Sequence, residues 1–251
     1  MLSVGAGSMR GMYLPNGPFR GSTAIRRGWL TRAALRARCV RLYPDVYLRR
    51  GVELDLVTRS HAALVLVRMH GVLAGWSAAA LYGASCIPPT APAELVVPRF
   101  LRAPPGLRVR YHRLADDERT EIDEQPLTTP LRTAYDLVRA APKMTEAVVA
   151  VDAMARRGRF PPDELLELAR RYPGARGTAK LRRGVALADR DAESPMETRT
   201  RLALVLGGLP KPALQLPVRH PGGPTDRLDM AYEEIKLGIE RRTPRRSCGP
   251  R

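Results

Sequence analysis

The sequence TRAALRARCVRLYPDVYLRR, residues 31–50, decides the fold of the N-terminal part of the chain. Thr31 can cap a helix from Arg32 to Ala37, because a threonine at this position accepts a hydrogen bond from the first helical turn. Cys39–Leu48 then alternates β-branched and aromatic residues around Pro44-Asp45, a pattern typical of a β-hairpin with a tight turn. The stretch therefore predicts a short helix followed by a hairpin.

A second short helix precedes this stretch. Ser22 can cap it, it covers Thr23–Arg27, and Gly28 ends it. Two short helices and a hairpin within about thirty residues are typical of a winged helix, in which the second helix enters the major groove of DNA and the hairpin touches the backbone. We expect residues 18–53 to form such a domain, preceded by a disordered leader at residues 1–17.

The charge of the chain is concentrated in this region. The whole chain has 42 Lys and Arg against 25 Asp and Glu, whereas residues 1–50 hold ten arginines and one acid, Asp45. A one-sided excess of this kind favours a nucleic-acid partner. Two alternatives stay open: an arginine-rich genome, and a basic surface used for protein contacts. The residues expected to contact DNA are Arg32, Arg36, Arg38, Arg41, Arg49 and Arg50.

Composition also restricts where the protein acts. Its three cysteines, Cys39, Cys86 and Cys248, lie far apart and match no disulfide framework or metal-ligand spacing. The N-terminus has no signal-peptide pattern. The most apolar stretch, residues 62–84, is interrupted by Arg68, so it is unsuited to span a membrane. We therefore expect a cytoplasmic protein that does not interact with membranes.

Residues 54–190 predict a mixed α/β middle region that serves as scaffold. Caps and periodicity predict several helices and three strands, and Asp152 is interpreted as a solvated helix residue. The expected helices are Leu56–Met69, Ser77–Tyr82, one that starts at Pro130, Thr145–Arg157, Asp163–Arg171 and Thr178–Ala188. The expected strands are Glu94–Pro98, Leu107–His112 and Ile122–Leu127.

Residues 191–240 carry a helix and three strands. Ser194-Pro195-Met196-Glu197 is a capping box with proline at the first helical position, and the helix it opens extends to Leu206. Strands are expected at Ala213–Val218, Arg227–Tyr232 and Ile235–Glu240. Residues 241–251 then contain five arginines without apolar periodicity, which predicts a disordered tail.

Three acidic residues of this segment are candidate catalytic residues. If the last two strands pair through a tight turn at Glu233-Glu234, then Asp229 and Glu240 lie on one face as diagonal neighbours. Glu197, near the start of the preceding helix, is the third. Asp229 and Glu240 could hold Mg²⁺, which activates water for phosphodiester cleavage. The alternative is that Glu197 only closes its capping box and the other two face solvent.

Two parts of the sequence resemble known families. GSTAIRRGWLTRAALR, CVRLYPDVYL and LAGWSAAALYGA resemble the AbiEi-type winged-helix antitoxin domain of actinobacterial proteins. SPMETRTRLALVLGGLPKPALQLPV and RLDMAYEEIKLGIE are similar to the start of domains related to very-short-patch-repair endonucleases, which have the PD-(D/E)XK nuclease fold. Glu197, Asp229 and Glu240 match the acidic positions of that family, whose pattern continues beyond Glu240 in a way this chain does not.

These observations predict an α+β protein with an N-terminal winged helix, a mixed α/β middle region and an incomplete C-terminal PD-(D/E)XK-like sheet. The expected function is DNA binding, with a truncated and inactive endonuclease-like domain at residues 191–240. One alternative is an antitoxin-like transcriptional regulator whose partner is a toxin protein encoded nearby. Another is an active Mg²⁺-dependent nuclease completed by a partner chain, and a homodimer fits either case.

Overall fold

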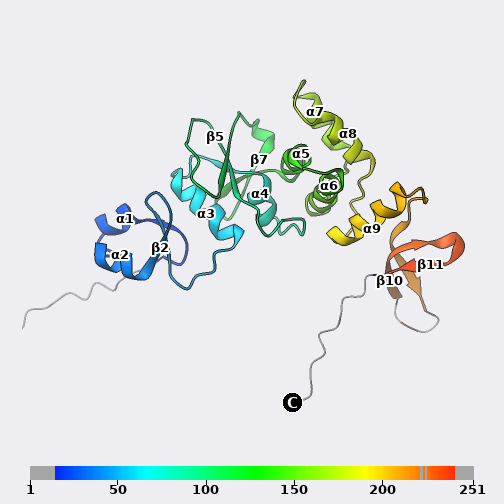
Figure 1. Ribbon diagram of the computed structural model, residues 1–251, viewed down its shortest axis with the longest axis horizontal. Helices are drawn as coiled ribbons and strands as arrows, with labels where there is room; N and C mark the ends of the chain where they lie inside the picture. Colours follow the sequence, from blue (N-terminus) through cyan, green and yellow to red (C-terminus); the bar gives the residue numbers. More distant parts are fainter. Residues whose placement is uncertain (1–14, 221–222, 224, 241–251) are drawn as a thin grey trace, which may run out of the picture. The chain divides into compact units, whose positions relative to one another are not determined.

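The computed structural model describes residues 15–220, 223 and 225–240, and in this part the chain is a mixed α/β protein with three β-sheets (Figure 1). The expected tail at residues 241–251 and residues 1–14 of the expected leader lie outside the described residues. None of the helices described in these ranges is long and apolar enough to cross a membrane.

The described residues form two compact units. The first contains the chain up to Leu81 together with Pro89–Thr128, and the second contains Tyr82–Pro88 together with the chain from Thr129 onward. The boundaries expected after residues 53 and 190 divide the chain more finely, and this partition does not test them.

The first unit begins with a small module of one strand, two helices and a hairpin. Thr31 caps the second helix as expected, because its side chain accepts the N–H of Ala34. Ser22 does not cap the first helix, which begins at Gly21, two residues earlier than expected. Its N–H and hydroxyl instead donate to the Asp45 carboxylate. The elements are β1 (Phe19–Arg20), α1 (Gly21–Arg26), α2 (Arg32–Arg38), β2 (Cys39–Tyr43) and β3 (Val46–Arg49).

The three strands form an antiparallel sheet in the order β1-β3-β2, and the next helix, α3 (Leu56–Leu66), contacts all of them. The expected cap of α3 is confirmed, since Asp55 accepts the N–H of Thr58. The helix ends before the expected Met69, because Arg68 and Met69 both have positive φ angles that no α-helix accommodates. The core of the module consists of Phe19, Ala24, Leu30, Leu35 and Cys39.

A five-stranded mixed sheet follows, in the order β6-β5-β4-β8-β7, and α3 and α4 (Gly75–Leu81) pack on β5 (Figure 1). One expected strand, Ile122–Leu127, is wrong as a single element. It is a hairpin whose turn residues Asp123 and Glu124 both have positive φ, as tight hairpin turns require. The strands are β4 (Val72–Leu73), β5 (Ala93–Val97), β6 (Leu107–Tyr111), β7 (Arg119–Ile122) and β8 (Gln125–Thr128), and a short 3₁₀ turn, η1 (Asp116–Glu118), precedes β7.

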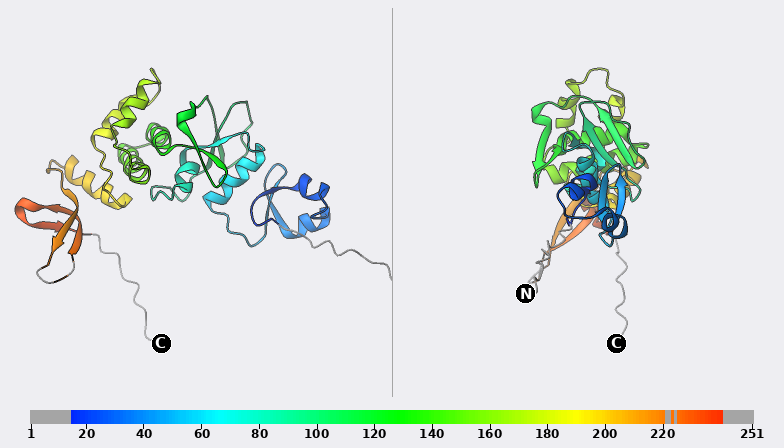
Figure 2. Two further views of the ribbon diagram at one scale, coloured as in Figure 1. Left: turned by 180° about the vertical axis from the view of Figure 1, so that it is seen from behind. Right: turned by 90° about the vertical axis from the view of Figure 1, so that its left-hand side faces the viewer.

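The second unit is helical before it ends in a sheet (Figure 2). Helices α5 and α6 pack against each other, and α6 also contacts α8 and α9. Thr129 and Ser194 cap α5 and α9 as expected. The helices are α5 (Pro130–Ala140), α6 (Met144–Gly158), α7 (Glu164–Arg170), α8 (Thr178–Ala186) and α9 (Pro195–Leu206).

The last sheet is antiparallel with the order β11-β10-β9, formed by β9 (Ala213–Arg219), β10 (Thr225–Tyr232) and β11 (Leu237–Ile239). The third strand begins later than expected. Glu233–Ile235 forms a 3₁₀ turn, η2, and Lys236 follows it with a φ of 52°, so the connection is longer than a two-residue turn.

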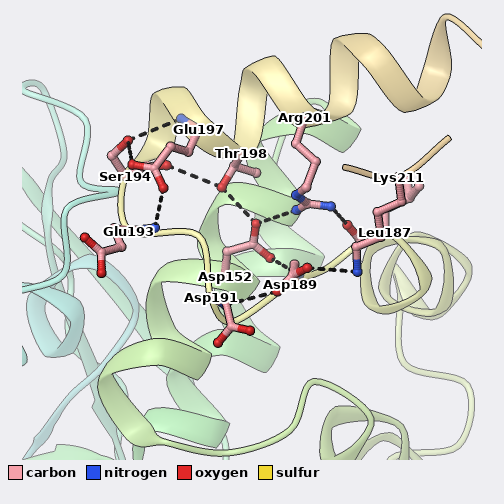
Figure 3. A network of polar contacts seen from close by, with 10 residues as sticks. All are labelled: Asp152, Leu187, Asp189, Asp191, Glu193, Ser194, Glu197, Thr198, Arg201 and Lys211. Atoms are coloured by element: carbon pink, nitrogen blue, oxygen red, sulfur yellow. Dashed lines mark hydrogen bonds and ion pairs between the residues drawn. The ribbon is translucent and has the colours of Figure 1, made fainter. Parts of the chain in front are cut away.

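A buried ion pair joins α6 to α9 (Figure 3). Arg201 donates to Asp152 at 2.7 Å, and both side chains are 2% exposed. The same carboxylate accepts the Thr198 hydroxyl and the N–H of Asp189, while Arg201 also donates to the carbonyl of Leu187. The interpretation of Asp152 as a solvated helix residue is therefore wrong, because the packing of α6 against α9 encloses it.

Candidate nucleic-acid interface

The six arginines expected to contact DNA all lie on the N-terminal module and are all exposed. Three belong to α2, one to β2 and one to β3, and the sixth directly follows β3. In that order they are Arg32, Arg36, Arg38, Arg41, Arg49 and Arg50. Figure 2 shows this module, with its small sheet and two short helices, from behind.

Helix α2 carries its positive charge on the face that points away from the core of the module. Leu35 is buried in the module, whereas Arg32 and Arg36 are exposed and lie one turn apart, on one face of the helix. Within the described residues, neither guanidinium has a recorded ion pair or hydrogen bond with a protein group, and the same is true of Arg49. Their donors are therefore available to an anionic ligand.

The one acid of the first fifty residues does not neutralise this surface. The carboxylate of Asp45 accepts from Arg20 at 2.9 Å and from the N–H and hydroxyl of Ser22 at 2.8 and 2.6 Å. Partial burial alone would raise the pKa of Asp45, but the hydrogen bonds from Ser22 and the charge of Arg20 outweigh it and lower that pKa. Asp45 thus fixes the hairpin turn against the start of α1.

The base of the hairpin is fastened to the end of α2. The N–H of Arg50 donates to the carbonyl of Arg38 at 2.8 Å, and its Nε donates to the carbonyl of Ala37 at 3.2 Å. Arg41 likewise donates to the carbonyl of Tyr43. These contacts hold the side chains in place but leave their positive charge uncompensated, because a carbonyl carries no net charge.

Two further exposed arginines were not among the expected contacts. Arg26 ends α1 and Arg27 follows it, with the guanidinium of Arg27 at 5.1 Å from the ring centre of Trp29. The signal was present in the sequence IRRGW, where two adjacent arginines precede a glycine and a tryptophan. They extend the basic surface beyond α2 and the hairpin.

The C-terminal unit positions the three candidate catalytic carboxylates differently. Glu197 is buried, and its oxygens accept from the N–H of Glu193, the hydroxyl of Ser194 and the amide of Gln215, at 2.7–2.9 Å (Figure 3 shows the first two). Half of the expected capping box is present: the Ser194 hydroxyl accepts the N–H of Glu197, but the Glu197 carboxylate accepts the N–H of Glu193 rather than that of Ser194. Protein donors already use both carboxylate oxygens.

Asp229 and Glu240 lie across the last sheet from one another. Met230 pairs with Ile239, so the next position outward places Asp229 opposite Glu240. This extended register makes the two positions directly opposite rather than diagonal, because the connection is longer than a two-residue turn. The shared face of the two carboxylates stays a prediction, since Glu240 lies beyond β11. Asp229 is half-buried, and Glu240, one residue beyond β11, is exposed.

Glu197, Asp229 and Glu240 do not form a preassembled metal-binding site. Among the described residues, no three or more His, Cys, Asp or Glu side chains are grouped so that they could hold a metal ion. Mg²⁺ prefers carboxylate oxygens that are open to it, whereas the oxygens of Glu197 are engaged by three donors. A magnesium site at Asp229 and Glu240 stays a prediction.

Comparison with known proteins finds two similar mycobacterial proteins. No protein-family model matches it, and no solved structure matches it significantly. It is 30% identical over 211 residues to the uncharacterized proteins MT2308 and Rv2248 from two strains of Mycobacterium tuberculosis. Each alignment covers 84% of this chain and 76% of the relative. The chain therefore belongs to the same protein family as Rv2248 and MT2308.

Proposed function

We propose that this protein binds double-stranded DNA through its N-terminal module, used as a winged helix. Helix α2 is the element that enters the major groove, and the β2–β3 hairpin is the wing that lies along the backbone. The observation that carries the proposal is the set of exposed arginines on these two elements, beside a single acid that Arg20 already pairs.

The arrangement of the module supports this assignment. Its order of strand, helix, helix and hairpin, with β1 pairing along β3, leaves α2 and the hairpin at the surface while Leu35 and Cys39 join the core. Arg32 and Arg36 extend from one face of α2, where they reach phosphates or base edges together. Arginine suits both roles, because its planar fork donates two parallel hydrogen bonds.

The test measures the binding of a short fluorescent duplex to the full chain by fluorescence anisotropy, at a series of salt concentrations. The affinity of the unmodified protein should fall steeply as salt rises, because each neutralised phosphate releases a counterion. The double variant Arg32→Ala/Arg36→Ala should bind more weakly at every salt concentration. Its slope of log affinity against log salt should be smaller by about 2, roughly 1 for each phosphate that is no longer neutralised.

A matched control removes the same charge elsewhere. Arg182→Ala/Arg183→Ala changes two exposed arginines of α8, and it should leave both affinity and salt slope unchanged if the N-terminal module is the interface. Duplex binding absent at low salt would refute the proposal. Equal reductions of affinity in the two double variants would also refute it, since only the net charge would then matter.

A further inference from the structure

A second surface of the first unit lies where β5 and β6 end. These two strands are parallel, and Val97 pairs with Tyr111 at their carboxyl ends. The loops that follow, residues 98–106 and 112–115, therefore leave the sheet at the same end, where the carboxyl ends of the two strands lie. Sheets with parallel strands commonly bind ligands just outside the carboxyl ends of those strands.

Two aromatic rings form a platform at this edge. Phe100 and Tyr111 stack with 5.7 Å between ring centres and 14° between ring planes. The Tyr111 hydroxyl donates to the carbonyl of Leu101 and accepts the N–H of the same residue, which fixes the orientation of its ring. Phe100 is 84% exposed and Tyr111 48% exposed. The chain thus holds a planar apolar surface of which the Phe100 ring is mostly open to solvent.

The segment that carries the platform is rich in arginine. Residues 98–115 contain five arginines and neither Asp nor Glu. Two of these arginines, Arg108 and Arg110, pair with the buried carboxylate of Glu94 at 3.2 and 2.8 Å. The other three are exposed and have no recorded ion pair or hydrogen bond within the part of the chain that the structure describes; they are Arg99, Arg102 and Arg113.

A cavity opens beside the platform. Its volume is about 640 Å³, within the range of pockets that hold small organic ligands. Val97 and Pro98, which follow one strand into its loop, line it together with His112 and Arg113, which follow the other. The wall therefore combines apolar surface with the imidazole of His112 and the guanidinium of Arg113, together with Asp116 and its ion-pair partner Arg119. This composition suits a molecule that has both a flat ring and an anionic group.

We propose that the Phe100–Tyr111 platform, with Arg99, Arg102 and Arg113, binds single-stranded nucleic acid. An unpaired base stacks on Phe100, the arginines contact the flanking phosphates, and the neighbouring nucleotide enters the cavity. Aromatic rings within a basic groove are the general means of binding unpaired bases, because every base has a face to stack. A duplex keeps its bases stacked inside, so the platform discriminates against it. This site is separate from the duplex surface proposed for the N-terminal module.

The experiment compares a labelled oligothymidylate with a labelled duplex, using the full chain at low salt and anisotropy as the measurement. Phe100→Ala should weaken single-strand binding about tenfold or more, since stacking on one aromatic ring contributes this much. The duplex affinity of Phe100→Ala should stay within about twofold of that of the unmodified chain, because a duplex base does not stack on Phe100. Phe100→Trp should restore single-strand binding. Arg99→Ala/Arg113→Ala should lower single-strand affinity and its salt dependence.

Controls separate this site from the N-terminal one and from a general loss of structure. Ile235→Ala removes a side chain that is 69% exposed in the other unit, and it should change neither affinity. Arg32→Ala/Arg36→Ala should weaken duplex binding and spare the single strand. A bromouracil-containing oligonucleotide should cross-link at Phe100 or Tyr111 on irradiation, with the adduct located by mass spectrometry.

Several outcomes would overturn the proposal. One is no single-strand binding at low salt, and another is single-strand binding that Phe100→Ala leaves intact. Binding of a free mononucleotide but of no oligonucleotide would assign the cavity to a small-molecule ligand. Failure of duplex binding alone would refute the N-terminal proposal and leave this one standing.

Discussion

The N-terminal module and the junction of α6 with α9 use arginine in opposite ways. On the module, Arg32 and Arg36 are exposed, and no protein group within the described residues is recorded as their partner. At the junction, Arg201 is almost fully buried and donates to Asp152 and to the carbonyl of Leu187. An arginine count alone does not separate these roles. A guanidinium that donates hydrogen bonds to buried protein groups contributes to stability, whereas one exposed to solvent is available to a ligand.

The largest effect is expected from breaking the buried pair. Arg201→Ala leaves the Asp152 carboxylate enclosed without its counter-charge, which should reduce the free energy of unfolding by about 3–5 kcal/mol. Urea unfolding followed by circular dichroism measures this reduction. Arg182→Ala, at an exposed position of α8, is the control and should change stability by less than about 0.5 kcal/mol.

A paired substitution distinguishes poorer packing from the unpaired charge. Arg201→Met/Asp152→Asn keeps most of the volume and an acceptor for the hydroxyl of Thr198, while both charges are removed. It should recover much of the stability that Arg201→Ala removes, since a buried pair replaced as a unit leaves no uncompensated charge. Recovery of none of it would contradict this account. Duplex affinity of either variant, measured where it remains folded, should match that of the unmodified chain.

A smaller effect is expected at Glu197, which lies at the first turn of α9. Glu197→Ala removes the acceptor used by Ser194, Gln215 and the N–H of Glu193, and it should cost about 1–3 kcal/mol because these partly buried donors lose their acceptor. Thermal unfolding measures it. If Glu197 were mainly a metal ligand, Mg²⁺ would raise the melting temperature of the unmodified chain and not that of Glu197→Gln, and that result would overturn the capping role.

What could be predicted from the sequence was mostly local. The caps at Thr31, Asp55 and Ser194 are confirmed, because each depends on a hydrogen bond to a residue three positions later. The hairpin after α2 is confirmed for the same reason, since Pro44-Asp45 determines its turn. The exposure of the six candidate arginines also agrees with the sequence, whereas their contact with DNA stays a prediction.

Contacts between distant residues could not be predicted. Asp152 and Arg201 lie 49 positions apart, and nothing in the sequence around Asp152 indicates that a later helix will cover it. The parallel pairing of β5 with β6 is equally non-local, and it is what brings Phe100 against Tyr111. The length of a turn between two strands also proved hard to predict, although it determines which residues of the strands pair. The positive φ of Lys236 moved the start of β11 and with it the register of Asp229 and Glu240.

The smallest expected effect is a pH dependence at Asp45, the acid of the basic module. Its pKa is lowered in the folded protein from a usual value of 3.8, so the unfolded chain binds the proton more readily. The stabilisation from Asp45 is therefore complete above pH 3.8 and is lost as the pH falls through the lowered value. Because the ion pair with Arg20 is partly exposed, the contribution should be only about 0.5–1 kcal/mol.

Asp45→Asn tests this contribution to stability, and it also tests whether exposed arginines of the N-terminal module are available to DNA. In urea unfolding, the stability of the variant should decline less than that of the unmodified chain as the pH falls below about 4, through the lowered pKa of Asp45, while the other carboxylates contribute equally in both chains. It should also bind the duplex at least as tightly, because Arg20 is released from its partner and adds to the exposed charge. Weaker duplex binding would instead mean that the position of the hairpin turn matters more than the charge it carries.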